Sequence, residues 1–556
     1  MSIVGQRCKA MTSKPNILII MADQLAPQAL SFYGNKVCKT PHLDRLAANS
    51  VVFDNAYCNY PLCVPSRASM MSGRLTPAIE VWDNACELAT SQPTMAHHLR
   101  HLGYHTVLSG KMHFIGPDQL HGFDERTVTD VYPSGFDWVA DWEAGPAFVP
   151  SATGLNGVVE AGSAARTLQE DFDEEVAHAA VQSIYDLARR GDDAGPWFQL
   201  ASFTSPHTPF VADQKYWNRY DPDVIDAPQV SALAFDDLDY ASRALFFAHG
   251  RHRHRVTEDN LRRARHGYYA MVSFIDDKVG EILSALEASG QADNTLVIFC
   301  ADHGEMLGER GMWFKQSFYE WSARVPLMVS APKKYEPRRV KDCVSLVDLL
   351  PTLVEIGGGK VSLPCDGESL EPALSGAATR DLVISDYYGI GPCVPYRMVR
   401  QGRYKLIYTH GYPDLLYDLE ADPDELDNLA SDPAHAGTLK RLKAILLDGW
   451  NPEEINQQVR TSQAERLFLK TTPGGLEDWD YIARKGDEMR YVRRGSGGVD
   501  GTKANRRLPR LEPVAPHFPE LSQKDVTAII VGEAPLPSYL SGRPRNRQLI
   551  KPKQSI

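Results

Sequence analysis

The sequence predicts an α/β protein: a large, mostly parallel sheet flanked by helices, then a smaller antiparallel sheet domain and an extended tail. Short apolar runs typical of buried strands alternate with helical patterns from residue 15 to residue 356, as in a parallel sheet with crossover helices. From about residue 380, short strand patterns follow one another through turns. We therefore expect an α/β domain over 1–378, a small α+β domain over 379–470 and a tail over 471–556.

Composition limits the expected partners and location. The chain has 556 residues and a formal net charge of −12, which argues against nucleic acid or an anionic membrane surface as a partner. The nine cysteines are spread widely, without CxxC pairs, and the first residues show no secretory pattern. We therefore expect a cytoplasmic protein. The apolar run 17–21 is too short to cross a bilayer, so no membrane association is expected.

Four predicted strands lead into polar residues. The runs 15–21, 105–109, 196–203 and 295–300 are typical of buried strands. The residues that follow them are Asp23, Lys111 with His113, His207, and Asp302 with His303, in that order. Open parallel sheets bind ligands beyond the carboxyl ends of their strands, so we expect the functional edge there. Each of these residues alone also fits a turn, a helix cap or a solvated loop.

Further patterns complete the predicted fold. Helices are predicted at 40–49, 93–102, 173–190, 261–288, 345–356 and 435–469, and strands at 325–330, 381–385, 396–401 and 404–409. Residues 114–170 are rich in Gly, Pro and aromatic residues, and we expect long loops over a pocket there. The basic stretch Arg493 to Arg510 is predicted to be a solvated, extended part of the tail.

The stretch around Cys63 predicts a helix start. Pro65 suits the first turn of a helix, and Gly73 suits its end. Cys63 would then lie just before a helix N-terminus, where free N–H groups and the helix dipole favour an anion. A lone cysteine is more often simply buried, so the surrounding residues decide between the two interpretations.

Those residues resemble a known family. Cys63-Val64-Pro65-Ser66-Arg67, followed by Ser72-Gly73-Arg74, resembles the sulfatase signature, and the stretch from Gly103 to His113 resembles the second one. The likeness covers roughly residues 14–450 and is greatest to choline sulfatases. It implies the alkaline-phosphatase-like fold. It also implies that a formylglycine-generating or other sulfatase-modifying enzyme converts Cys63 to formylglycine, whose hydrated aldehyde is the nucleophile.

The resemblance also implies roles for individual residues. One divalent cation would be bound by Asp23, Gln24, Asp302, His303 and the modified Cys63. Many sulfatases have Asp where Gln24 stands and Asn where His303 stands. Oxygen ligands favour Ca²⁺, whereas an imidazole suits Mn²⁺ better, and Mg²⁺ is a further alternative. The other catalytic residues implied are Arg67, Lys111, His113, His207 and Lys315, and the implied substrate-binding residues are Asn84, Trp138 and Trp142.

The predicted activity is hydrolysis of a small organic sulfate monoester, which is choline sulfate-like, alkyl or aryl. The segment Tyr387 to Gly391 lacks the acidic residue that choline sulfatases carry, which weakens the preference for a cationic ester. The alternatives are a phosphonate monoester or phosphodiester hydrolase of the same superfamily, and a non-catalytic binding protein. In choline sulfatases a similar tail reaches a neighbouring subunit, so the resemblance also implies a homo-oligomer, either a dimer or a tetramer.

Overall fold

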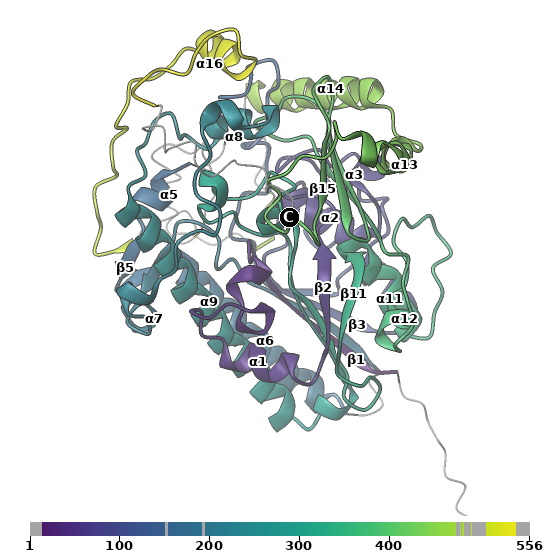
Figure 1. The fold of residues 1–556 in the computed structure, drawn as a ribbon. Helices are drawn as coiled ribbons and strands as arrows, with labels where there is room; N and C mark the ends of the chain where they lie inside the picture. The colour runs from purple at the N-terminus through teal and green to yellow at the C-terminus, as the bar shows by residue number, and fades with distance from the viewer. Residues whose placement is uncertain are drawn as a thin grey trace, which may run out of the picture.

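The computed structural model describes residues 14–150, 154–191, 195–473, 479, 481–482, 491 and 507–540. Within these residues, an eight-stranded sheet forms the centre of the molecule, in the order β11-β2-β10-β9-β1-β7-β3-β4 (Figure 1). The strands are β1 (Asn16–Ala22), β2 (Val51–Tyr57), β3 (His105–Gly110), β4 (Glu125–Val128), β7 (Trp197–Ser202), β9 (Thr295–Ala301), β10 (Leu327–Ser330) and β11 (Arg338–Ser345). Only β10 runs antiparallel to its neighbours in this described sheet. The predicted mostly parallel sheet is therefore confirmed.

Helices cover both faces of this sheet (Figure 1). On one face, α6 (Leu168–Arg189) packs against β3, β7 and α9 (Glu258–Ala288), and α1 (Pro41–Ala47) packs against α9. On the other face, α2 (Cys63–Ser72), α4 (Met95–His101) and α11 (Leu349–Ile356) pack against one another. The layered arrangement agrees with the alternation of strand and helix patterns in the sequence.

The central strand β1 explains how residues far apart in the sequence meet. All seven of its residues are buried, because it lies between β7 and β9 and under helices on both faces. The parallel register places Met21 opposite both Ser202 and Cys300. The segments that follow β1, β7 and β9 therefore begin side by side at one edge of the sheet, as the sequence predicted.

Three strands of the sheet escaped the sequence prediction: β2, β11 and β4, the last of which lies in the region expected to be loops. The residue patterns of β2 and β11 show why those two were missed. β2 has the half-exposed pair Asp54 and Asn55 in its middle, which interrupts the apolar run. β11 carries Arg338, Arg339 and Lys341, because it lies at the edge of the sheet and its charged side chains reach solvent. Neither pattern resembles the continuous apolar runs of the central strands.

A second sheet follows in the chain. It has the order β12-β13-β14-β15 and is antiparallel throughout, as predicted; its strands are β12 (Leu382–Tyr387), β13 (Tyr396–Gln401), β14 (Tyr404–Thr409) and β15 (Leu415–Asp418). The helical stretch predicted at 435–469 is two helices, α13 (Ala436–Leu447) and α14 (Pro452–Thr471). The break arises because Asn451 caps the second helix and Pro452 opens it.

The region expected to be loops, 114–170, is loop for most of its length but also contains β4, α5 (Asn156–Val159), β5 (Gly162–Ala164) and β6 (Arg166–Thr167). α6 begins at Leu168, five residues before the predicted start. Thr167 and Glu170 form a capping box there, with each side chain accepting a hydrogen bond from the other's backbone N–H. This T-x-x-E signal was available in the sequence.

The described part of the tail packs back onto the same chain (Figure 1). β16 (Arg507–Leu508) pairs with β6, and α16 (Gln523–Ile530) packs its apolar face on α8 (Tyr240–Ala248). Most of the basic stretch predicted to be solvated lies outside the described residues, but Arg507 donates hydrogen bonds to the carbonyls of Glu160 and Ser163, so the prediction is wrong for that residue. Among the described helices, none combines the length and apolar character needed to cross a membrane.

Candidate active site

Two carboxylates lie at the edge of the sheet where β1 and β9 end. Asp23 and Asp302 each stand two residues beyond the paired residues Met21 and Cys300, and both are fully buried. The backbone N–H of Gln24 donates to Asp302 Oδ1 at 3.0 Å, which ties the two segments together. Two buried carboxylates so close together require positive charge nearby.

Arg67 supplies part of that charge. It lies one turn after Cys63 on α2, and its guanidinium donates to Asp302 Oδ2 at 2.8 Å and to Asp23 Oδ2 at 3.0 Å. A third hydrogen bond, of 2.8 Å, reaches the Ser202 hydroxyl at the end of β7. Burial alone would lower the pKa of Arg67, but the carboxylates of Asp302 and Asp23 raise it above its usual value. Arg67 is therefore a fixed cation beside residue 63.

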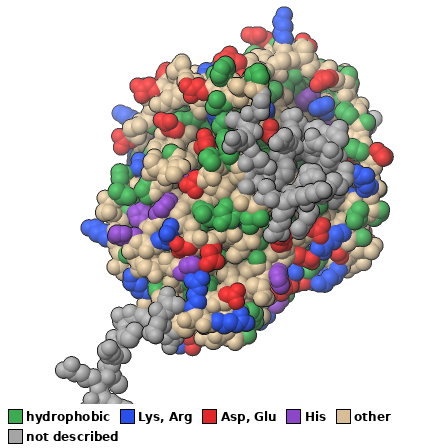
Figure 2. Space-filling model, turned by 180° about the vertical axis from the view of Figure 1, so that it is seen from behind, with side chains coloured by type: hydrophobic (Ala, Val, Ile, Leu, Met, Phe, Trp, Pro, Cys, Tyr) green, Lys and Arg blue, Asp and Glu red, His purple; other side chains and the backbone are tan. Residues whose placement is uncertain are grey.

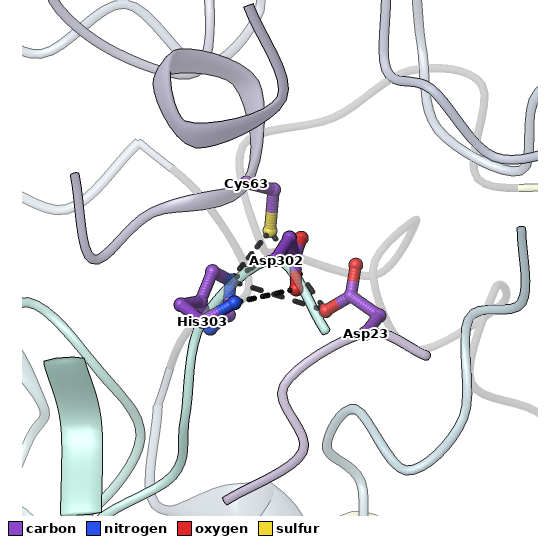
Figure 3. Close-up of side chains that lie close together, drawn as sticks. All are labelled: Asp23, Cys63, Asp302 and His303. Atoms are coloured by element: carbon purple, nitrogen blue, oxygen red, sulfur yellow. Dashed lines mark hydrogen bonds and ion pairs between the residues drawn. The ribbon is translucent and has the colours of Figure 1, made fainter. Parts of the chain in front are cut away.

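Cys63 is the first residue of α2, so the predicted placement of this residue at a helix N-terminus is confirmed. Its sulfur lies 3.3 Å from His303 Nε2 (Figure 3). Candidate ligand atoms of Asp23, Cys63, Asp302 and His303 all lie within 4.8 Å of one another, and all four residues are buried. Two carboxylates, an imidazole nitrogen and a sulfur in such proximity are a donor set that fits a divalent cation.

The tautomer of His303 supports this fit. Its Nδ1–H donates to the carbonyl of Gly304 at 3.1 Å, which leaves the Nε2 lone pair directed toward the cluster. Burial lowers the pKa of His303 to about 4, so the imidazole is neutral near pH 7, as a metal ligand must be.

Gln24 lies beside this cluster, and other partners hold its side chain. Its Nε2 donates to Glu305, and its Oε1 accepts a hydrogen bond from Lys315. Glu305 is fully buried and also accepts the backbone N–H groups of Leu307 and Phe314. The amide oxygen of Gln24 is thus fixed toward Lys315, and its predicted role as a metal ligand stays a prediction.

Lys111 and His113 follow β3, as predicted. The ammonium of Lys111 pairs with Asp23 and lies 3.8 Å from Cys63 Sγ. Burial lowers the pKa of His113, against the opposing effect of the Cys63 sulfur beside it. The backbone N–H groups of Met112 and His113 donate to Asp130 at 2.9 and 2.5 Å, which fixes the turn between the two side chains.

His207 lies in the loop after β7 and is hydrogen-bonded to Lys315. Its Nδ1–H donates to the carbonyl of Thr208 at 2.7 Å, so Nε2 accepts from Lys315 Nζ at 2.9 Å. Burial and the charge of Lys315 hold the pKa of His207 well below its usual value. Tyr132 completes this side: its hydroxyl lies 3.2 Å from His207 Nδ1, and Lys111 Nζ lies 4.2 Å from the centre of its ring.

The three predicted substrate-binding residues differ in placement. Asn84 accepts the backbone N–H of Val64 at 3.0 Å, immediately beside Cys63. The ring of Trp138 meets the ring of His113 edge-on at 5.4 Å. Trp142 instead donates its indole N–H to the carbonyl of Gly389 at 2.8 Å. The structure thus brings Asn84 and Trp138 to the group around Cys63, whereas the contacts of Trp142 are with the C-terminal part of the chain.

Four further residues support the site but were not singled out from the sequence. They are Asp130, Tyr132, Asp173 and Glu305. Asp173 accepts the backbone N–H groups of Thr204 and Ser205 at 2.7 and 2.8 Å and so anchors the loop of His207. Asp130 and Tyr132 lie in the aromatic loop region, and Glu305 lies two residues after His303, so only their proximity to the motifs could have suggested them.

Comparison with known proteins agrees with this geometry. The family described as sulfatase matches residues 15–359. A second family, described as N-sulphoglucosamine sulphohydrolase, C-terminal, matches residues 308–450. A choline-sulfatase of Rhizobium meliloti (strain 1021) is 40% identical over 90% of this chain and 100% of its own length. An arylsulfatase K of Gallus gallus is 29% identical over 82% of this chain and 86% of its own. A crystal structure of a phosphonate monoester hydrolase of Agrobacterium radiobacter superposes with a TM-score of 0.62 at 25% identity, covering 84% of this chain and 100% of that one.

The first family match spans more than half of the chain and contains Asp23, Cys63, Lys111, His207 and Asp302, the residues that the fold brings together. The choline-sulfatase is also matched over its entire length. The chain belongs to the sulfatase family and is a sulfuric ester hydrolase.

Proposed function

We propose that this chain hydrolyses a small organic sulfate monoester to an alcohol and inorganic sulfate, using formylglycine made from Cys63. The observation that carries the proposal is the position of Cys63 at the N-terminus of α2, between Lys111, Arg67 and the cluster of Asp23, Asp302 and His303. A sulfate ester is very stable in water, so its hydrolysis needs a fixed nucleophile, neutralised sulfate oxygens and a protonated leaving group. The residues around Cys63 are of the types that supply each of these.

The positive groups act on the sulfate. Lys111 Nζ, which pairs with Asp23 beside the sulfur of Cys63, and the N–H groups at the start of α2 face the place where the sulfate oxygens would lie. Arg67 is locked between two carboxylates and orients the side chain of residue 63. A divalent cation held by Asp23, Asp302, His303 and residue 63, for which we propose Ca²⁺ ahead of Mn²⁺ or Mg²⁺, supplies further positive charge to the sulfate oxygens.

Two groups of residues carry out the proton transfers: Lys315 with His207 on one side of residue 63, and His113 on the other. On one side, Lys315 donates a hydrogen bond to Nε2 of His207, so either Lys315 itself, or His207 after taking that proton from Lys315, gives a proton to the alcohol oxygen as the S–O bond breaks. On the other side, the neutral His113 can take the proton of the second hydroxyl of residue 63. Loss of that proton expels inorganic sulfate by breaking the C–O bond and restores the aldehyde. The first hydroxyl of residue 63 has by then attacked sulfur, with Asp302 beside it to take the proton, so no second attack on sulfur is needed.

We propose that the substrate is a choline sulfate-like, alkyl or aryl sulfate. The similarity to a choline-sulfatase and the position of Trp138 beside His113 support a small organic group next to the sulfate. An aromatic face can attract a quaternary ammonium group by about 1–2 kcal/mol when both are desolvated. The segment Tyr387 to Gly391 offers no carboxylate to such a cation, so we do not restrict the proposal to choline sulfate.

The deciding experiment is a turnover screen of sulfate, phosphate and phosphonate esters. It uses the metal-loaded protein after coexpression with a formylglycine-generating enzyme, and the Cys63→Ala variant as the blank. Peptide mass spectrometry across residue 63 measures the modification, which we expect at this cysteine and at no other. Sulfate ester turnover that is lost in Cys63→Ala supports the proposal. Phosphonate or phosphodiester turnover above sulfate turnover would favour the alternative hydrolase, and full activity with an unmodified thiol would contradict the formylglycine mechanism.

A cytoplasmic location and the modifying enzyme as a partner are part of the same proposal. Support for the location is that the cysteines in the described part of the chain are all free, as is usual in a reducing compartment.

A further inference from the structure

Helix α14 carries an unusual face. Arg460, Gln463, Arg466 and Lys470 recur at three- and four-residue intervals, so they share one side of the helix. Each of them contacts residues more than 300 positions earlier in the sequence. Polar side chains of a surface helix normally face solvent, but these point toward the segments that carry Asn84 and Trp138. In Figure 1, α14 lies at the top of the view, above α2 and α3 (Thr76–Ile79).

Arg466 makes the strongest of these contacts. Its guanidinium forms a bidentate ion pair with Asp83, with N–O distances of 2.5 and 3.0 Å. The two side chains are only 8% and 2% exposed. Asp83 Oδ1 also accepts the backbone N–H of Ala85 at 2.9 Å, which bends the chain around Asn84. The guanidinium fork therefore fixes both the position and the orientation of this turn.

The turn contacts the chain around Cys63 at two points. Asn84 accepts the N–H of Val64, the second residue of α2. The carbonyl of Trp82 accepts the hydroxyl of Tyr60 at 2.6 Å, three residues before Cys63. Residues 82–84 are thus bound to the chain just before and just after Cys63, and Arg466 binds the same turn through Asp83.

The same face of α14 also holds the loop that contains residues 137–143. Lys470 Nζ donates to the carbonyl of Asp137, the residue before Trp138, at 2.8 Å. Gln463 accepts the backbone N–H of Trp142 at 2.9 Å. Arg460 pairs with Glu143 and lies 5.6 Å from the Trp142 ring. One helix thereby positions two separate segments of the candidate substrate pocket.

We propose that Arg466 is a positioning residue, which holds Asp83 and Asn84 against the N-terminus of α2 and so sets the geometry of residue 63. This inference rests on the proposed function of Cys63. A buried ion pair costs desolvation free energy, and an apolar pair of similar size usually stabilises a fold as well or better. The directional fork between Arg466 and Asp83 is therefore better explained by the orientation it gives to Asn84 than by stability.

A double-mutant cycle tests the coupling. Arg466→Met and Asn84→Ala should each lower kcat/KM for a sulfate ester by about 10- to 100-fold, because small displacements of reacting groups are costly. If Arg466 acts through Asn84, the double variant should be no slower than the slower single variant. Independent effects that multiply would overturn the proposal, because a merely structural arginine gives additive free energies. Arg441→Met, an exposed arginine on α13, is the matched control and should keep the parent kcat/KM.

Amide hydrogen exchange tests the same inference without turnover. The Val64 amide is protected by its bond to Asn84, so exchange in the peptide that contains Val64 should be faster in Arg466→Met than in Arg441→Met. Arg466→Lys keeps the charge but loses the fork, and serves if the methionine variant does not fold. Unchanged exchange at Val64 in the folded variant would contradict the proposal. Because this measurement needs no substrate, it gives a result even if the sulfatase activity itself is not found.

Discussion

Asp302 has two roles in the candidate site: it is a candidate metal ligand, and its carboxylate holds the guanidinium of Arg67. Oδ1 accepts the backbone N–H groups of Gln24 and His303, each at 3.0 Å, and Oδ2 accepts from Arg67. We expect Asp302→Ala to lower both bound metal and turnover, because it removes a carboxylate ligand and releases Arg67. Metal content by inductively coupled plasma mass spectrometry and kcat with an aryl sulfate are the measurements.

Two companion variants make this result interpretable. Asp302→Asn keeps the shape of the side chain but not its charge, so it should also lose metal while folding more readily. Asp293→Ala removes an exposed carboxylate near the start of β9 and should keep full metal content. Normal metal content and normal rate in Asp302→Ala would show that the cluster around Cys63 is not the metal site.

Substitutions of Trp138 and of Trp142 can be compared to test substrate recognition, because the two side chains have different surroundings. Trp138 meets the ring of His113, whereas the indole of Trp142 is bound to Gly389 and buried against α14. We expect Trp138→Ala to change the ratio of kcat/KM between choline sulfate, a neutral alkyl sulfate and an aryl sulfate. Trp142→Ala should lower stability by about 3–5 kcal/mol, as truncation of a buried aromatic does, and leave that ratio nearly unchanged.

The outcome of that comparison also decides between substrates. A large preference for choline sulfate that Trp138→Ala abolishes would show that no carboxylate is needed near Tyr387 to Gly391. Equal effects of both tryptophan variants on the ratio would contradict the different roles that the structure suggests.

At the residue scale, the sequence located the side chains that follow a strand or open a helix. Asp23, Lys111, His207 and Asp302 are identifiable because an apolar run ends just before each of them. Asp130, Tyr132 and Asp173 were missed, since their roles arise from contacts across the fold, such as the bond from Tyr132 to His207. No local pattern distinguishes such a residue from an ordinary loop or helix residue.

At the scale of elements, α6 controls the loop that carries His207. Asp173 lies in the second turn of this helix and binds the backbone of Thr204 and Ser205. Burial raises the pKa of Asp173 to about 7 from an ordinary value of 3.8. The folded chain thus holds this proton more tightly than the unfolded chain, so the stabilisation from Asp173 is complete below pH 3.8 and is lost as the pH rises to about 7.

The expected result is a pH-dependent difference between variants. In Asp173→Asn the group no longer titrates, so the free energy of unfolding of the parent, relative to this variant, should fall by about 1.4 kcal/mol for each pH unit between 4 and 7. Urea unfolding at pH 5 and pH 7 measures it. Asp186→Asn, an exposed residue of the same helix, is the control and should show no such trend. A difference that stays constant with pH would contradict the assignment to Asp173.

α14 shows why some elements were only partly predictable. The sequence indicated a helix there, and Asn451-Pro452 is a recognisable start. Its packing was only partly predictable, because its buried residues are the apolar Ile455 and Val459 in the first half of the helix but the polar Gln463 and Arg466 in the second half. Amphipathic patterning identifies only helices that bury apolar side chains.

At the scale of the whole molecule, the two sheets are joined by buried charges. Lys405 of β14 is fully buried and donates to Glu320 at 2.8 Å and to Glu425 at 2.5 Å. Glu320 also accepts the hydroxyl of Tyr57, at the end of β2. This network fixes the four-stranded sheet against the segment that carries Lys315, so the smaller sheet contributes to the geometry of the site without supplying a side chain to the cluster around Cys63.

We expect the protein to form a homo-oligomer, either a dimer or a tetramer, through contacts that involve α14 or the tail. Phe468 and Leu469 of α14 are 72% and 43% exposed, and Phe468 is the most exposed of the large apolar side chains in the described part of the chain, which makes this place the one we would test for contact with a second copy. The described tail also has an internal partner, because Val526, Ile529 and Ile530 of α16 pack on Phe246 and Phe247 of α8. Truncation at residue 470 therefore removes contacts within the chain as well as any contact between copies, so it needs a second variant beside it.

Phe468→Glu is that variant, because it changes the exposed face of α14 and leaves the tail in place. We expect light scattering to give a mass of two or four copies for the full chain, and a smaller mass for both the truncated chain and Phe468→Glu. A charge placed at an apolar contact is desolvated without a partner, so even one such change should separate the copies. If only the truncated chain dissociates, the tail and not α14 forms the contact. A single-copy mass for the full chain would show that the prediction of an oligomer is wrong.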